Sequence, residues 1–373
     1  MDKSENKKTL EDYKISTSLI YNDLAWGPLF RAKDGDIVKN TDNQAAKYIL
    51  ESLNIMKIPK KDLKGKKVFN IGTGRESRFF AENGSIVTHL DIAEDSVNSL
   101  KLWSKENKIP IDSTCGDIAD CEIGHNKFDI IFLSGIYQHI REPAYSLLKF
   151  INALKPNGLM YMGFYRSGEF KYFIVDSIRH LIEKKMMSAT RSLNAILFTL
   201  GEINHYQSTR VIDDFYVPRK HNFHPKDVIH DINLLGGEIY NFDNDLRDYN
   251  HEGEDYFSIG GDRIYITKKN NNVKNLDDVK DKLKTTKGKN QLFDIEYKEK
   301  IILENLKLIK KIKLYSQTGF VKDENIIALC LGLYQFTRPF IFKESQYFQE
   351  SKKGRHKTLN KYLKNFIENF VQI

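Results

Sequence analysis

The stretch Lys66–Glu76, KKVFNIGTGRE, decides the fold of this chain. Its short apolar run, Val68–Ile71, predicts a buried strand, and Gly72 and Gly74 follow directly. Glycine adopts positive φ at no steric cost and lets a ligand approach the backbone, while the free N–H groups of the following helix face that ligand. We therefore expect a strand-to-helix turn that binds a nucleotide-like ligand.

Apolar runs alternate with helix-period segments beyond this turn, which is typical of an α/β doubly wound, mostly parallel sheet. The strongest strand, Phe128–Leu133, has the near-continuous apolar character of a strand buried on both faces. The remaining strands are expected at Ile86–Leu90, at Ile109–Ile111 or Ser113–Cys115, and at Leu159–Phe164, Glu238–Phe242 and Asp262–Lys268. The helices are expected at Ser77–Asn83, Ser96–Asn107, Pro143–Leu154 and Pro225–Leu235, with a turn at Lys155–Gly158.

The sequence around this core divides into further segments. Thr41-Asp42 is the expected N-cap of an amphipathic helix in the N-terminal segment. A helical, aromatic and basic stretch interrupts the alternation after the fifth strand, where such insertions commonly form a substrate lid. The expected divisions are 1–60 as a helical cap, 61–269 as the core, 165–224 as its lid insertion, 270–290 as a linker and 291–373 as a basic helical unit.

Composition indicates a soluble cytoplasmic protein. Of 373 residues, only Cys115, Cys121 and Cys330 are cysteines, without metal-ligand spacing, which favours a reducing compartment over a disulfide scaffold. The charged N-terminus lacks the apolar core of a signal peptide. No apolar run reaches the roughly 20 residues of a membrane span. We therefore expect no membrane span.

The net charge of +8 is unevenly distributed. From Lys268 to the C-terminus, 23 Lys/Arg stand against 12 Asp/Glu, a net +11 on the last 106 residues. Such a basic unit is compatible with nucleic acid, an anionic surface or an acidic partner, although Lys-rich helices exposed to solvent are the explanation that we favour. The apolar faces of these helices also leave a homodimer open.

Acidic residues end two of the expected strands. Asp91 follows the second strand, and Asp117 follows the region of the third. Because the carboxyl ends of parallel strands meet at one sheet edge, we expect both to lie beside the glycine turn. There Asp91 can accept two ribose hydroxyls, and Asp117 can accept the amine of an adenine ring that Ile92 and Ile118 enclose.

At this point the chain resembles the class I S-adenosylmethionine-dependent methyltransferases over about residues 60–269. The segments that carry the resemblance match the family's motifs in order and spacing: NIGTG (Asn70–Gly74), HLDIAE (His89–Glu94), GDIAD (Gly116–Asp120), FDIIFLSGIYQHI (Phe128–Ile140) and LKPNG (Leu154–Gly158). The resemblance implies a Rossmann-like fold and S-adenosyl-L-methionine as cofactor. A nicotinamide cofactor is the rival, but its third glycine would stand at Ser77.

The resemblance also implies site residues. His139, in the tail of the fourth strand, is the candidate catalytic base, and a structural histidine that holds the loop or the cofactor is the alternative. Asn70 stands where the family usually has an acid, and Glu76 where a third glycine is common. The expected cofactor-binding residues are Asn70, Gly72, Thr73, Gly74, Arg75, Asp91, Ile92, Asp117, Ile118, Ser134 and Gly135.

The acceptor is expected under the insertion. The dense cluster Asp213–Pro225 supplies aromatic, basic and histidine side chains for a polar small molecule or glycan. Part of it, His224-Pro225, is also a plausible helix start, and a metal site from Asp214, His221 and His224 would lack a further ligand. No metal is therefore expected. The expected substrate-binding residues are Tyr137, Tyr216, Arg219 and His221.

Three hypotheses follow from these features. The first is a methyltransferase that acts on a small-molecule or sugar-like acceptor. The second is an RNA (tRNA) methyltransferase that uses the basic C-terminal unit to bind RNA. The third is a non-catalytic partner that keeps the cofactor fold for assembly. The acceptor atom cannot be read from these residues.

Overall fold

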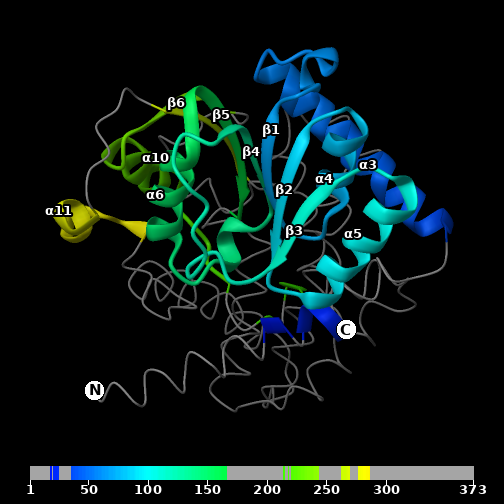
Figure 1. Ribbon diagram of the computed structural model, residues 1–373. Helices are drawn as coiled ribbons and strands as arrows, with labels where there is room; N and C mark the ends of the chain where they lie inside the picture. Colours follow the sequence, from blue (N-terminus) through cyan, green and yellow to red (C-terminus); the bar gives the residue numbers. More distant parts are fainter. Residues whose placement is uncertain are drawn as a thin grey trace, which may run out of the picture. The chain divides into compact units, whose positions relative to one another are not determined.

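A seven-stranded sheet forms the centre of the computed structural model, which describes residues 17–18, 20–24, 35–165, 213–214, 217, 220–242, 262–268 and 276–285. The strand order is β3-β2-β1-β4-β5-β7-β6 (Figure 1). The five strands β1 to β5 pair in parallel, whereas β7 is antiparallel to both of its neighbours. The expected mostly parallel, doubly wound sheet is therefore confirmed. The strands are β1 (Lys67–Ile71), β2 (Ile86–Asp91), β3 (Ile111–Cys115), β4 (Phe128–Ser134), β5 (Leu154–Phe164), β6 (Gly237–Phe242) and β7 (Asp262–Lys268).

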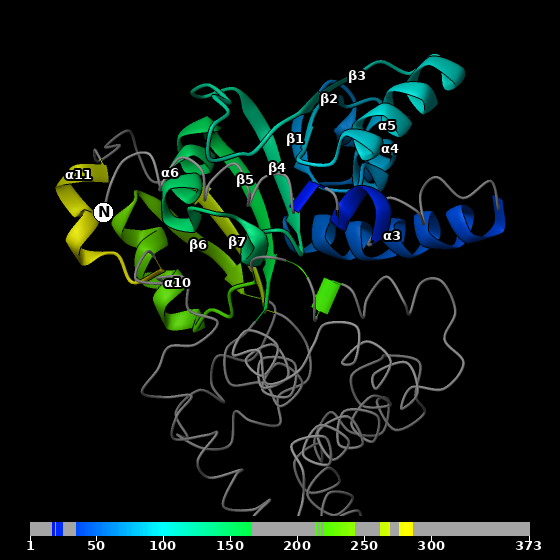
Figure 2. The same cartoon turned by 90° about the horizontal axis from the view of Figure 1, so that it is seen from below.

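Helices cover both faces of this sheet (Figures 1 and 2). The first face packs against α6 and α10, and the second against α3 and α4, with α5 beside β2 and β3. Alternate residues of β4 supply both cores: Ile131 and Leu133 face the first layer, and Ile130 and Phe132 the second. This explains why β4 needs apolar residues at successive positions. The helices are α3 (Gly35–Ile55), α4 (Arg75–Glu82), α5 (Glu94–Asn107), α6 (Pro143–Ala153) and α10 (Pro225–Leu234).

The start of α3 differs from the prediction. The helix begins at Gly35, so the expected cap residues Thr41 and Asp42 lie inside it. The Asp42 carboxylate instead accepts a hydrogen bond from the Arg78 guanidinium of α4, at 2.5 Å. Asp42 therefore ties two packed helices together, and the pairing across helices replaces the local cap.

Two other boundaries also move. The third strand is β3, which begins at Ile111 and includes the second of the two centres that the sequence left open. The expected turn at Lys155–Gly158 is absorbed into β5, where Asn157 has a positive φ of 63° and the pairing with β4 shifts register. The turn residues thus form an irregularity within one long strand.

The predicted linker at 270–290 contains an anchored segment. Its short helix α11 (Leu276–Val279) leads into a turn that buries Val279 and Leu283 in the core beside α6 and α10. The fully buried Asp231 carboxylate accepts hydrogen bonds from the backbone N–H groups of Lys284 and Thr285 and from the Thr285 hydroxyl. The sequence predicted a linker here because most of the stretch is polar, but Val279 and Leu283 pack into the core.

All described residues belong to one compact unit built from ranges 1–165, 205–246 and 261–289. Most of the expected lid insertion at 165–224 lies outside the described residues, as does the expected C-terminal unit at 291–373. Among the helices that are described, none combines the length and the apolar character that crossing a membrane requires.

The Asp231 anchor predicts a stability effect. Asp231→Ala leaves the buried Thr285 donors without an acceptor, so we expect the free energy of unfolding to fall by roughly 2–3 kcal/mol. The matched control is Asp227→Ala on the same helix, because Asp227 forms only a partly exposed ion pair with Lys284 at 3.7 Å and should contribute less than about 1 kcal/mol. Urea unfolding measures both variants. An equal fall in the free energy of unfolding in the two variants would contradict the stabilising role of Asp231.

Candidate active site

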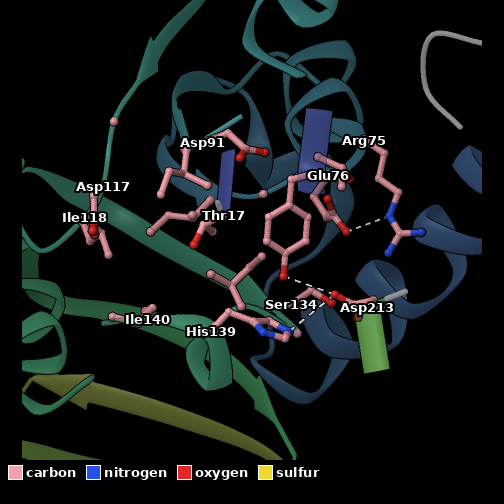
Figure 3. A pocket seen from close by; sticks show the side chains of 18 of the residues that line it. Thr17, Arg75, Glu76, Asp91, Asp117, Ile118, Ser134, His139, Ile140 and Asp213 are labelled. Atoms are coloured by element: carbon pink, nitrogen blue, oxygen red, sulfur yellow. Dashed lines mark hydrogen bonds and ion pairs between the residues drawn. The ribbon is translucent and has the colours of Figure 1, made fainter. Parts of the chain in front are cut away.

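A cavity of about 230 Å³ opens at the carboxyl ends of β1, β2 and β4. This is many times the roughly 10–15 Å³ of such space that one water molecule needs, so the cavity has room for an organic ligand. Figure 3 shows side chains from several strand ends converging on it. Its lining consists of Thr17, Tyr21, Ile71, Gly72, Thr73, Arg75, Glu76, Asp91, Ile92, Gly116, Asp117, Ile118, Ser134, Gly135, Ile136, His139, Ile140, Tyr165 and Asp213.

The glycine turn forms one wall. Gly72 has a φ of 124°, and a Cβ atom there would lie 3.0 Å from Ile136 Cδ1, so only glycine fits without strain. The Gly72 carbonyl lies 2.6 Å from Nε2 of the buried His89, whose Nδ1 lies 2.8 Å from the Ser113 hydroxyl. Burial lowers the pKa of His89 to about 4, so the ring is neutral. Because a carbonyl can only accept, Nε2 donates to Gly72 and Nδ1 accepts from Ser113.

Two expected cofactor residues lie behind this wall. Asn70 is fully buried, donates through Nδ2 to the Phe132 carbonyl and accepts from the Ser77 hydroxyl at 2.7 Å. It therefore joins β1 to β4 and to α4 and does not line the cavity. Gly74 is the N-cap of α4 with a φ of 85°, packed beside Leu100 and also outside the lining. Both residues shape the turn from within the fold.

Asp91 reaches the cavity from the end of β2. One of its oxygens accepts the Ala93 N–H at 2.9 Å. Burial raises the pKa of Asp91 to about 6, although the N–H groups of Ala93 and Ile92 and the Ser96 hydroxyl act in the opposite direction. The carboxylate is thus ionised at neutral pH at an energetic cost, and it presents a strong acceptor to a hydroxyl-bearing ligand.

Asp117 lies farther along the same edge, after β3. Its carboxylate accepts the Ala119 N–H at 2.9 Å and a hydrogen bond from Arg141 Nε at 3.2 Å. Arg141 also pairs with Asp120 at 2.7 Å, so this guanidinium orients the loop that carries Asp117. The apolar part of the lining adds three residues to the expected pair: it consists of Ile71, Ile92, Ile118, Ile136 and Ile140.

His139 and Asp213 meet at another part of the cavity (Figure 3). His139 Nε2 lies 3.7 Å from Asp213 Oδ1, and both side chains are about nine-tenths buried. Tyr21 donates to Oδ1 and Tyr165 donates to Oδ2 of the same carboxylate, at 3.2 and 3.3 Å. The rings of both tyrosines also contact the His139 ring edge to face. This arrangement fixes a histidine beside an acid in a nearly enclosed site.

Arg75 and Glu76 form a third cluster, in the first turn of α4. Arg75 Nε lies 2.9 Å from Glu76 Oε1, and the hydroxyl of Tyr48, from α3, donates to that same oxygen. The Arg75 guanidinium lies over the Tyr48 ring at 5.7 Å. Burial alone would raise the pKa of Glu76, but Arg75 and the hydrogen bonds from Tyr48 and Arg75 outweigh it and lower the pKa. Glu76 is therefore ionised at neutral pH.

The expected substrate residues have different positions. Tyr137 is fully buried against Phe164 and Phe223, so this prediction needs correction: Tyr137 is a core residue, because its 3-10 turn directs it away from the cavity that His139 lines. His221 is also buried outside the lining, and its backbone N–H donates to the Gln138 carbonyl at 2.7 Å. Tyr216 and Arg219 lie outside the described residues.

The rest of the 213–225 cluster has structural partners. Asp214 pairs with the buried Lys220 at 3.0 Å. His224 is the N-cap of α10 and accepts the Lys226 N–H through Nδ1. In the part of the chain that the structure describes, no three metal-ligating side chains gather into a site.

The cavity includes residues that the sequence did not single out for the site. Glu76 stands beside the glycine motif and Asp213 within the dense cluster, but no local pattern distinguishes Asp213 from Asp214. Tyr21 lies far from the motifs, in an aromatic N-terminal segment that could wall a pocket. Ile136, Ile140 and Tyr165 carried no signal beyond proximity to a strand end, and Thr17 precedes the first strand by about 50 residues. These residues reach the site through contacts between distant segments.

The raised pKa of Asp91 predicts a pH-dependent stability difference. Ionising Asp91 is harder in the folded protein (pKa about 6) than in the unfolded chain, where it is 3.8. The wild-type protein therefore loses stability as pH rises from about 4 to 6, by about 3 kcal/mol at most. In the absence of ligand, we expect Asp91→Asn to unfold at higher urea than wild type at pH 7.5, with the advantage vanishing near pH 4. The control Asp112→Asn, on the exposed side of β3, should change little at either pH. A stability difference between Asp91→Asn and wild type that stays the same at both pH values would contradict the raised pKa of Asp91.

Comparison with known proteins agrees with this geometry. Residues 69–162 match the family model of the methyltransferase domain. Ubiquinone biosynthesis O-methyltransferase of Coxiella burnetii (strain RSA 493 / Nine Mile phase I) is 26% identical over 146 residues, which are 38% of this chain and 58% of that protein. The enzyme of the same name from Idiomarina loihiensis is 32% identical over 102 residues, 26% of this chain and 41% of that protein.

The chain thus spans about half the length of the curated relatives that it matches. Among solved structures, magnesium protoporphyrin IX methyltransferase from Synechocystis PCC 6803, with bound SAH, superposes with a TM-score of 0.44 and 14% identity, covering 70% of this chain and 99% of that one. The matched residues 69–162 include the end of β1, all of β2, β3 and β4, and thus most of the cavity wall. Residues 69–162 therefore match a methyltransferase domain, as the resemblance to the class I S-adenosylmethionine-dependent methyltransferases predicts.

Proposed function

We propose that this protein transfers the methyl group of S-adenosylmethionine to a small-molecule acceptor whose reacting atom carries a proton. One observation carries the proposal: a single cavity joins the glycine turn and two acidic strand ends to a buried histidine–carboxylate pair. The glycine turn and the acidic strand ends suit a nucleoside ligand, and the histidine–carboxylate pair suits proton transfer.

The charge of the cavity fits the cofactor. Four carboxylates line it, from Glu76, Asp91, Asp117 and Asp213, against the single guanidinium of Arg75. S-adenosylmethionine carries a sulfonium in addition to its amino-acid zwitterion, so an acidic cavity favours it. Asp91 would hold the ribose, Asp117 the adenine amine, and the isoleucines the faces of the ring. When bound, the cofactor supplies a methyl group activated by the positive charge on sulfur.

The residues of this chain then have three tasks. The cavity positions the acceptor and excludes water, which is the main requirement of a direct displacement. His139 takes the proton that the acceptor atom loses as it becomes methylated. Asp213 faces the ring at 3.7 Å and stabilises the imidazolium that forms, while Tyr21 and Tyr165 hold Asp213 in place.

A hydroxyl on a small molecule is the acceptor that we favour. A hydroxyl oxygen attacks more readily when a base removes its proton, which gives the His139–Asp213 pair a role. The relatives are named as O-methyltransferases of ubiquinone biosynthesis, which supports the same class of acceptor. Two described residues of range 165–224, Tyr165 and Asp213, line the cavity, which supports our placing the acceptor under this insertion.

Cofactor binding tests the assigned site. Asp91→Asn removes the charged acceptor for the ribose hydroxyls, so we expect the affinity for S-adenosylmethionine to fall by roughly 10- to 100-fold in isothermal titration calorimetry. The same variant should be more stable than wild type without ligand, which separates lost binding from lost folding. The exposed Asp112→Asn serves as the control with wild-type affinity. Unchanged binding by Asp91→Asn would rule out this site.

The role of His139 has its own test. His139→Asn should slow transfer by roughly 10²- to 10⁴-fold while the cofactor affinity stays within about twofold. Product formation from labelled S-adenosylmethionine, after a screen of small-molecule acceptors identifies a substrate, measures the rate. His125→Asn, in an exposed loop, is the matched control and should retain the wild-type rate. Equal rates in all three proteins would leave His139 with a structural role only.

A further inference from the structure

Glu76 is a buried carboxylate that the proposed roles of Asp91, Asp117 and Asp213 leave unused. Its side chain is 4% exposed, yet it lines the cavity. An ionised side chain at such a depth is costly unless charges and hydrogen bonds compensate, and here Arg75 and Tyr48 do so. The protein therefore maintains a negative charge at this point of the cavity wall.

The position of Glu76 matters for an extended ligand. Figure 3 shows Asp117 and Ile118 at one end of the cavity and Glu76 with Arg75 at the other, with Asp91 between them. A nucleoside whose base lies at Asp117 and whose ribose lies at Asp91 would extend its 5′ substituent toward Glu76. In S-adenosylmethionine that substituent ends in an amino acid, which carries an ammonium and a carboxylate group.

The hydrogen bonds of Glu76 leave one oxygen for a ligand. Tyr48 and Arg75 both donate to Oε1, and the backbone N–H of Glu76 also stabilises the carboxylate, but among the described residues no side chain donates to Oε2. Asp213 differs, because each of its two oxygens accepts a tyrosine hydroxyl. Asn70, at the end of β1, is neutral and fully buried. Its amide donates to the Phe132 carbonyl and accepts from the Ser77 hydroxyl. Glu76 is thus the carboxylate in this region best placed to accept from an ammonium.

We propose that the Glu76 carboxylate binds the α-ammonium group of the cofactor and thereby makes this chain select ligands that carry an intact amino-acid end. The inference rests on the proposed cofactor and assigns a specificity-determining role to a residue of the first turn of α4. Arg75 and Tyr48 are positioning residues, since both donate to Oε1 and neither donates to Oε2.

Three ligands separate this role from general cofactor binding. S-adenosylhomocysteine has the ammonium group, its deamino analogue lacks only that group, and 5′-methylthioadenosine lacks the whole amino-acid end. We expect wild type to bind S-adenosylhomocysteine roughly 10- to 100-fold more tightly than the deamino analogue, as a charge-assisted hydrogen bond implies. Glu76→Gln should lose that preference and bind 5′-methylthioadenosine with wild-type affinity, as measured by calorimetry.

Two further variants control the experiment. Glu82→Gln makes the same change at an exposed position of the same helix and should keep the wild-type preference. Tyr48→Phe removes a donor to Oε1 but leaves the carboxylate, so it should also keep a preference for the ammonium. If Glu76→Gln folds poorly, the wild-type protein still tests the role, because equal wild-type affinities for S-adenosylhomocysteine and its deamino analogue would overturn it.

The outcomes separate the two proposals. A wild-type protein that binds none of the three ligands would overturn both the cofactor assignment and the role of Glu76. If wild type binds them but Glu76→Gln keeps the full preference for the ammonium group, the cofactor assignment stands and the role of Glu76 is wrong. An equal loss of 5′-methylthioadenosine and S-adenosylhomocysteine in Glu76→Gln would also overturn it. If Glu76→Gln loses the preference for the ammonium group but still binds 5′-methylthioadenosine with wild-type affinity, the role of Glu76 is supported.

Discussion

The parallel pairing of β1 with β4 is the constraint on which the site depends. These two strands lie side by side from Val68 opposite Ile130 to Ile71 opposite Leu133, but the helices that follow them pack on opposite faces of the sheet. The two connections therefore diverge at the carboxyl ends and leave a crevice between them. Gly72 enters this crevice from one strand and Ser134 from the other.

Buried charge is the second organising feature. Asp117 and Glu76 each have an arginine beside them, Arg141 and Arg75, whereas Asp91 has only hydrogen-bond donors and its pKa is raised. The fold thus keeps an ionised carboxylate at some cost to its own stability, which is common where a group is held ready for a ligand. A ligand that donates hydroxyls to Asp91 would offset that cost when it binds.

The glycine turn shows how the chain combines an apolar core with an acidic cavity. Asn70 lies in the core as a neutral residue, where its amide satisfies a backbone carbonyl of β4 and a hydroxyl of α4. The negative charge lies six residues later, at Glu76, in the first turn of α4. A charge at position 70 would be enclosed by protein, whereas at position 76 it faces the cavity with two donors to support it.

The sequence by itself determined the layered α/β fold, the alternation of strands and helices, and the strand ends that carry Gly72, Asp91 and Asp117. Local apolar periodicity and the residue at a strand end suffice for these predictions, since parallel strands must share an edge. Tertiary packing set the rest. Tyr21 and Asp213 are 192 residues apart and meet in one hydrogen bond, and Tyr137 enters the core while His139 of the same turn lines the cavity. Such contacts depend on how separate segments pack together, and no local pattern in the chain records that packing.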